Sequence, residues 1–215
     1  MEENLYQTQY DVTKKSKIRK FYDSNKILIF SAIFILVVTL GSTGIYLEYK
    51  KNKRVELSEN YLQAKFYLES GKKDKAINIL RETIFANDST YSTLSFFLLM
   101  NRNLITDLKE INTLFDHLLK KNKFSNELKD LLIFKRALLN SDNVSETELL
   151  AYMKPILNSE SIWRPHCLLL MGDYFVSKGE NLKGKEFYQK IFEIKNLHND
   201  LYNHATAQLA MISNE

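Results

Sequence analysis

The sequence contains one cysteine, two prolines and six glycines among 215 residues. A single cysteine excludes an intramolecular disulfide. Because glycine and proline are the residues that most often interrupt helices and form turns, their scarcity favours long helices joined by short polar turns. We therefore expect an all-α fold.

Groupings of side chains that indicate catalysis or metal binding are also missing. No two histidines have the H-x-x-x-H spacing of a metal site, and we find no paired carboxylates, Ser/His/Asp or Cys/His set at a meaningful spacing. Cys167 adjoins the apolar run 168–170, which favours a buried, unreactive thiol. We therefore expect no enzyme activity, no metal, no cofactor and no small-molecule substrate.

One stretch, GENLKGKE at 179–186, departs by a single residue from the phosphate-binding pattern G-x-x-x-x-G-K-[ST]. Glu186 stands where that loop needs a hydroxyl to bind magnesium, and residues 167–178 before it have a helical period, not that of a strand. We interpret Gly179 as the left-handed end of one helix and Gly184 as a packing contact in the next.

The longest apolar run, ILIFSAIFILVVTLGSTGIYL, covers residues 27–47 without a charge. A bilayer core needs about 20 such residues in a helix. A buried core helix is normally shorter, and a signal peptide has a shorter apolar core and leader. Small residues at 42–44 leave cleavage open, but an uncleaved anchor fits better. The sequence predicts a basic tail (1–26), a transmembrane helix (27–47) and a helical domain (48–215).

Basic residues flank this run in nearly equal numbers on its two sides. The predicted topogenic residues on the N-terminal side are Lys14, Lys15, Lys17, Arg19, Lys20 and Lys26. The positive-inside rule applies to short tails, whereas long domains translocate largely regardless of their charge. We therefore expect the tail in the cytoplasm and residues 48–215 on the opposite side of the membrane.

The basic cluster KKSKIRK at 14–20 has an alternative role in binding nucleic acid or anionic lipid. Beside a membrane helix we interpret it as the signal that sets topology. The domain at 48–215 carries 24 basic and 22 acidic residues, so it lacks the excess of positive charge that DNA- or RNA-binding domains have. We expect no nucleic-acid partner.

Apolar residues recur with helical spacing throughout the rest of the chain. The predicted helices cover 57–71, 72–85, 89–100, 107–121, 126–139, 146–157, 161–178, 182–194 and 200–212. Ser161 is the expected N-cap of a helix with Pro165 in its first turn, and Pro155 is expected to kink or restart its own helix.

Two stretches, 61–84 and 168–191, share a spacing of small residues around a turn glycine. The predicted packing positions are Ala64, Gly71, Ala76, Gly172, Gly179 and Gly184. This pattern resembles the tetratricopeptide repeat, a helix–turn–helix unit of about 34 residues. The resemblance implies a degenerate α-solenoid whose first helices line a concave partner-binding face. Candidate partner-binding residues on those helices are Asn60, Gln63, Tyr67, Arg164 and Asp173.

The segment IRKFYDSNK at 18–26 combines basic and aromatic residues directly before the apolar run. With one anchor and a degenerate repeat domain behind it, this segment is similar to the YfgM-like family, ancillary subunits of the bacterial Sec translocon. The resemblance implies an inner-membrane protein with a periplasmic domain that binds SecYEG channel subunits and periplasmic chaperones. An envelope-assembly or regulatory adaptor unrelated to secretion would share all these features, so both hypotheses remain open.

Overall fold

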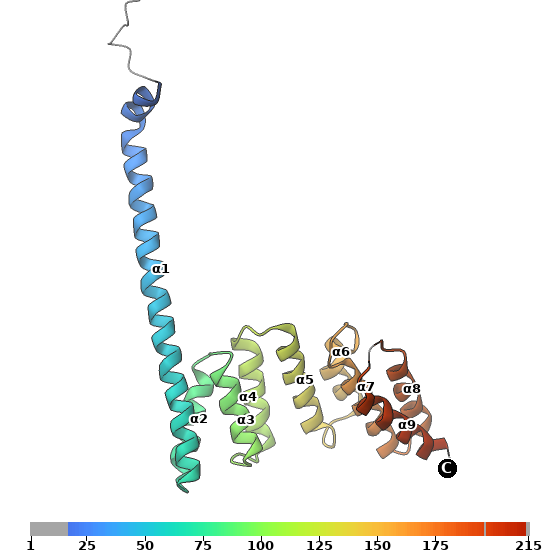
Figure 1. The fold of residues 1–215 in the computed structure, drawn as a ribbon. Coiled ribbons are helices and arrows are strands. Elements are labelled where there is room, and N and C mark those ends of the chain that lie inside the picture. The colour runs from blue at the N-terminus through green and yellow to red at the C-terminus, as the bar shows by residue number, and fades with distance from the viewer. Residues whose placement is uncertain (1–16, 196, 214–215) are drawn as a thin grey trace, which may run out of the picture. The chain divides into compact units, whose positions relative to one another are not determined.

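The computed structural model describes residues 17–195 and 197–213, and all secondary structure in this part of the chain is helical (Figure 1). The helices are α1 (Lys17–Glu69), α2 (Lys73–Phe85), α3 (Tyr91–Asn101), α4 (Leu108–Lys121), α5 (Asn126–Asn140), α6 (Glu146–Leu157), α7 (Arg164–Ser177), α8 (Asn181–Phe192) and α9 (Asn199–Ser213). The predicted all-α class is confirmed for these residues. Of the predicted topogenic residues, Lys14 and Lys15 lie outside them, as do the side chains of Lys17 and Lys20.

Helix α1 is longer than the sequence pattern predicted. It covers the apolar run, the charged segment at 48–56 and the first predicted helix of the domain. Neither glycine nor proline, the residues that most strongly interrupt helices, occurs between Ile45 and Ser70. The chain divides into two compact units, residues 1–56 and 57–215, and α1 contributes to both.

Polar side chains mark the starts of three helices in the second unit. Asp107 begins α4 by accepting a hydrogen bond from the backbone N–H of Lys109. Ser125 begins α5 in the same way. At α6, Ser145 and Glu148 bond reciprocally to each other's backbone N–H groups, which is a capping box. Each cap satisfies N–H groups that have no partner inside the first helical turn.

The start of α7 differs from the prediction. The helix begins at Arg164, with Trp163 at the N-cap position and Pro165 in the first turn, so Ser161 is not the N-cap. The Ser161 hydroxyl instead accepts a hydrogen bond from the N–H of Trp163 at 3.2 Å. It therefore stabilises the turn before the helix. Pro155 lies inside α6, which continues past it to Leu157, so the predicted restart of the helix at this residue is wrong.

Three turns between helices share one backbone arrangement. After α1, Gly71 has a φ of 74°, and the N–H of Lys72 donates to the carbonyl of Tyr67 at 2.8 Å. After α7, Gly179 has a φ of 78°, and the N–H of Glu180 donates to the carbonyl of Phe175 at 2.9 Å. After α3, Asn103 has the same role with a φ of 49° and an equivalent 2.9 Å bond. These are Schellman turns, which need a residue in the left-handed region.

The core of the second unit consists of three successive clusters. The first joins the end of α1 to α2, α3 and α4 and reaches Leu132 of α5. The second joins α5, α6 and α7, and the third joins α7, α8 and α9. Helix α7 belongs to two clusters, with Met171 in the second and Leu168 in the third. The helices of this unit are thus held mainly by their neighbours in sequence.

Cys167 is fully buried in the second cluster, which confirms the prediction for its side chain. Burial, with a smaller effect from the negative charge of Asp130, raises the pKa of its thiol to about 12. A thiol with this pKa is almost entirely protonated at neutral pH, so Cys167 packs as a small apolar residue.

Candidate membrane helix and protein-binding surfaces

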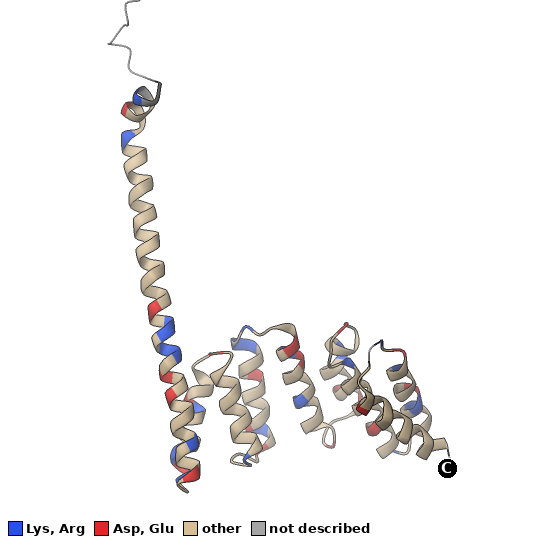
Figure 2. Ribbon diagram, viewed as in Figure 1, with Lys and Arg blue, Asp and Glu red and all other residues tan. Residues whose placement is uncertain are grey.

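Among the described residues, α1 is the one helix that is long and apolar enough to cross a membrane. Its most apolar stretch is not buried among the described residues, and Figure 2 shows it as the long segment of α1 without charged residues. The side chains of Ile27 and Ile45 are each 75% exposed, and that of Phe34 is 70% exposed. Exposure of this much apolar surface to water is unfavourable, so the helix requires an apolar environment. A signal sequence meets the same criteria of length and composition.

The polar side chains inside this stretch have hydrogen-bond partners in the helix itself. The hydroxyl of Ser42 donates to the carbonyl of Thr39 at 3.0 Å, and that of Thr43 donates to Leu40 at 2.9 Å. The hydroxyl of Thr39 donates to the carbonyl of Ile35. Since a hydroxyl without a partner is costly in hydrocarbon, these bonds make the stretch compatible with a bilayer.

Helices α7 and α8 approach closely at two glycines. A Cβ atom on Gly172 would lie 2.3 Å from Cε1 of Tyr188, and one on Gly184 would lie 2.6 Å from Cγ2 of Val176. Both distances are shorter than real Cβ contacts. The predicted packing role of these glycines therefore has a steric basis. In the other aligned stretch, the predicted packing residues Ala64 and Ala76 are fully buried in the first cluster.

The same geometry decides against a phosphate-binding loop at 179–186. Gly179 follows the helix α7 and not a β-strand, and Gly184 lies buried inside α8 against α7. Lys185 and Glu186 are exposed on α8. The match to the phosphate-binding pattern is accidental.

Three of the predicted partner-binding residues, Asn60, Gln63 and Tyr67, lie on the last turns of α1. Nε2 of Gln63 is 3.4 Å from the hydroxyl oxygen of Tyr67. The Tyr67 ring packs against the first core cluster on one side and has the ammonium group of Lys75 5.8 Å from its centroid. Gln63 is exposed, and Asn60 and Tyr67 are partly exposed. This group is open to a partner.

The other two predicted residues, Arg164 and Asp173, are partly buried on α7 and have contacts within the fold. Oδ1 of Asp173 accepts a hydrogen bond from the hydroxyl of Tyr188 on α8 at 2.6 Å. Burial raises the pKa of Tyr188, and the hydrogen bond to Asp173 raises it further, so this hydroxyl remains a donor. Nε of Arg164 is buried and has no hydrogen-bond partner among the described residues. Asp173 therefore has a structural role that the sequence pattern did not predict.

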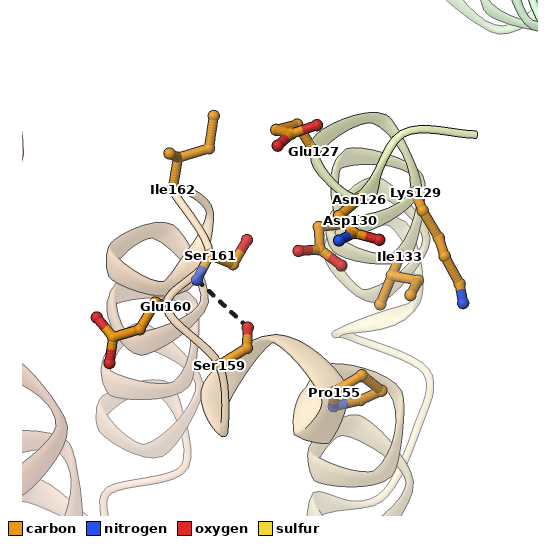
Figure 3. Close-up of a pocket in the computed structure, with 10 residues that line it drawn as sticks. All are labelled: Asn126, Glu127, Lys129, Asp130, Ile133, Pro155, Ser159, Glu160, Ser161 and Ile162. Carbon is orange, nitrogen blue, oxygen red and sulfur yellow. Dashed lines mark hydrogen bonds between the residues drawn. The ribbon is translucent and has the colours of Figure 1, made fainter.

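A pocket of about 470 Å³ lies between the start of α5 and the turn that precedes α7 (Figure 3). The carboxylates of Glu127 and Asp130 lie on the α5 side, while Glu160 on the other side extends away from them in the figure. Ile133 and Pro155 supply apolar lining. Residues distant in sequence meet here, and no motif in the sequence indicated this.

The described lining of the pocket contains the carboxylates of Glu127, Asp130 and Glu160 and one ammonium group, that of Lys129, so acidic groups predominate. The pKa of Glu127 is lowered by a hydrogen bond from its own backbone N–H and by another from Ser125, so its carboxylate stays ionised. The chemistry of the pocket suits a positively charged side chain. Nowhere among the described residues do three or more His, Cys, Asp or Glu side chains form a group that could hold a metal ion.

Comparison of the chain with protein-family models, curated proteins and solved structures found no match. The resemblances to the tetratricopeptide repeat and to the YfgM-like family therefore remain predictions. Any function proposed for this chain therefore has to follow from its own sequence and geometry.

Proposed function

We propose that this protein is a single-pass membrane protein whose helical domain binds protein partners and carries out no catalysis. The observation that carries this proposal is the exposed, uncharged stretch 27–47 of α1, which precedes a domain of paired helices. A helix with this exposed apolar surface needs a bilayer, and a domain of packed helix pairs offers long side-chain surfaces for other proteins.

The turn geometry supports a degenerate tetratricopeptide-like solenoid. Schellman turns follow α1, α3 and α7, with Gly71, Asn103 and Gly179 in the left-handed position. The first two lie nearly one repeat length apart, taking that length as about 34 residues. In this arrangement α1, α3, α5 and α7 are the first helices of successive pairs, and together they line the concave partner-binding side.

For orientation, we propose that the tail at 1–26 is cytoplasmic and that the domain is periplasmic in the bacterial inner membrane. The short basic tail supports this, because translocating it is less favourable than translocating a long domain of mixed charge. The proposed partners are channel subunits of the Sec translocon and periplasmic chaperones. The basic–aromatic segment at 18–26 supports that choice through its similarity to the YfgM-like family.

Site-specific photo-crosslinking in native membranes tests this function. Probes replace Tyr22, Ile35 and Gln63, which are exposed on α1, and a control probe replaces Leu182 on α8, which is 80% exposed. We expect the α1 probes, but not the control probe, to form adducts with translocon channel subunits or periplasmic chaperones. Adducts of the Gln63 probe with cytoplasmic proteins would contradict the orientation. Adducts with other envelope proteins alone would favour the second candidate, an adaptor for envelope assembly.

A further inference from the structure

A second cavity, of about 400 Å³, lies between α3 and α5. Phe97 and Met100 line it from α3, and Leu131, Leu138 and Leu139 line it from α5. Most of these side chains are only partly buried, and that of Leu138 is 43% exposed. The cavity is therefore an open groove with apolar walls.

The groove coincides with a gap in the helix packing. Helix α5 packs directly against α7, and α7 against α9, so successive odd-numbered helices touch in the second half of the unit. Between α3 and α5, both of which are described over their full length, there is no such close approach of the backbones. Phe97, Met100 and Leu139 pack against the first core cluster and also line the groove.

The lining of the groove includes a positively charged side chain. Helix α3 contains no charged residue, and Lys135 of α5 is the one charged side chain among the described residues that line the groove. The neighbouring cation, Arg136, is occupied, since it bonds to Oδ1 of Asp116 at 2.8 Å and to Oδ1 of Asn112 at 3.1 Å. Lys135 itself is exposed. A ligand that fits this surface offers apolar side chains together with a carboxylate.

We propose that the groove between α3 and α5 binds an amphipathic helix of a partner protein, with its apolar face on Phe97 and Leu138 and an acidic side chain paired with Lys135. The apolar groove between two helices is the surface on which amphipathic helices dock through side chains at i, i+3, i+4 and i+7, and the lone positive charge selects an acidic helix. This inference rests on the proposed partner-binding function and names the surface and the partner's chemistry.

Binding of model helices to the full-length protein in nanodiscs tests the groove. Two synthetic amphipathic peptides share one leucine face and differ only in a flanking residue, glutamate in one and lysine in the other; fluorescence anisotropy gives their affinities. The wild type is expected to bind the glutamate peptide about two- to fivefold more tightly, the range of a single exposed ion pair. Lys135→Glu is expected to reverse this preference, and Leu138→Asp to weaken both peptides about tenfold or more.

Lys185→Glu and Leu182→Asp, both at exposed positions of α8, are the matched controls and should leave both affinities unchanged. The melting temperature of each variant shows whether it is folded. An unchanged preference in Lys135→Glu, or wild-type affinity in Leu138→Asp, would overturn the inference. Self-association of the wild type that is abolished by Leu138→Asp would also overturn the inference, because a second copy of this chain would then occupy the groove.

The photo-crosslinking experiment separates this inference from the proposed function. If Leu138→Asp retains every partner adduct of the wild type, the protein binds its partners through another surface, so the groove inference is wrong and the proposed function stands. If the wild type gives no protein adduct from any probe, the proposed function itself is wrong.

Discussion

Tyr188 of α8 donates a hydrogen bond from its hydroxyl to Oδ1 of Asp173 on α7 over 2.6 Å. The Tyr188 ring is fully buried and lies over Gly172, where any side chain would collide with it. Tyr188 therefore requires both a glycine at position 172 and a hydrogen-bond acceptor at position 173 of the facing helix α7. This relationship fixes how α7 and α8 pack.

Replacement of Tyr188 by phenylalanine keeps the ring and removes the hydrogen bond. Because a hydrogen bond to a charged group contributes about 1.5–3 kcal/mol, we expect the free energy of unfolding to fall by about that amount. Urea unfolding of the full chain in detergent, followed by circular dichroism, measures this. Tyr202→Phe, at a ring that is 51% exposed, is the control and should have little effect. Equal stabilities of Tyr188→Phe and wild type would show that the bond contributes nothing.

Gly172→Ala tests the close approach of the two helices. Within a helix this change usually stabilises by up to about 1 kcal/mol, but here the new Cβ would lie 2.3 Å from the Tyr188 ring. Overpacking of this kind costs about 1–3 kcal/mol, so we expect a net loss of stability. Lys185→Ala, on the exposed face of α8, is the control and should be nearly neutral. A stabilised Gly172→Ala protein would contradict the observed packing.

A partly buried amide pair connects α4 to α5. Nδ2 of Asn112 donates to Oδ1 of Asn140 at 2.8 Å, and Nδ2 of Asn140 donates back to Oδ1 of Asn112 at 3.0 Å. Asn140→Ala leaves its partner without these bonds, so we expect a loss of about 1–3 kcal/mol. A double-mutant cycle with Asn112→Ala should show that the two effects are not additive. Asn143→Ala, at an exposed position, is the control. Strict additivity would contradict the pairing.

The buried thiol of Cys167 makes stability depend on pH in the alkaline range. Its pKa is about 12 in the folded protein, against an ordinary value of 9.0. The folded state therefore holds the proton more tightly, so this contribution is fully present below about pH 9 and is lost as pH rises toward 12. We expect unfolding experiments to show a steeper alkaline loss of stability in the wild type than in Cys167→Ala. Identical pH profiles would show that the thiol is not buried.

Sequence alone predicted the helical class, most helix boundaries and the left-handed Gly179, because each depends on local residue preferences. It missed the left-handed Asn103, although asparagine is the residue other than glycine that most readily adopts this conformation. It also placed a cap at Ser161, where the hydroxyl instead stabilises a preceding turn.

Contacts between distant residues were harder to predict. Asp173 has the spacing of an exposed first-helix residue, and only the approach of α8 gives it Tyr188 as a partner. The groove between α3 and α5 results from a backbone contact that does not form, and no residue pattern encodes such a gap.

The proposed function requires a membrane anchor with a cytoplasmic tail and a domain on the other side of the membrane. Single cysteines at Ser24 and Asn203, both exposed, are introduced into a Cys167→Ala background and treated with a membrane-impermeant maleimide on intact spheroplasts. We expect Asn203→Cys to be labelled at once and Ser24→Cys only after lysis, with both proteins remaining in the membrane on alkaline extraction. Labelling of Ser24→Cys alone before lysis, or release of either protein by alkali, would contradict the account.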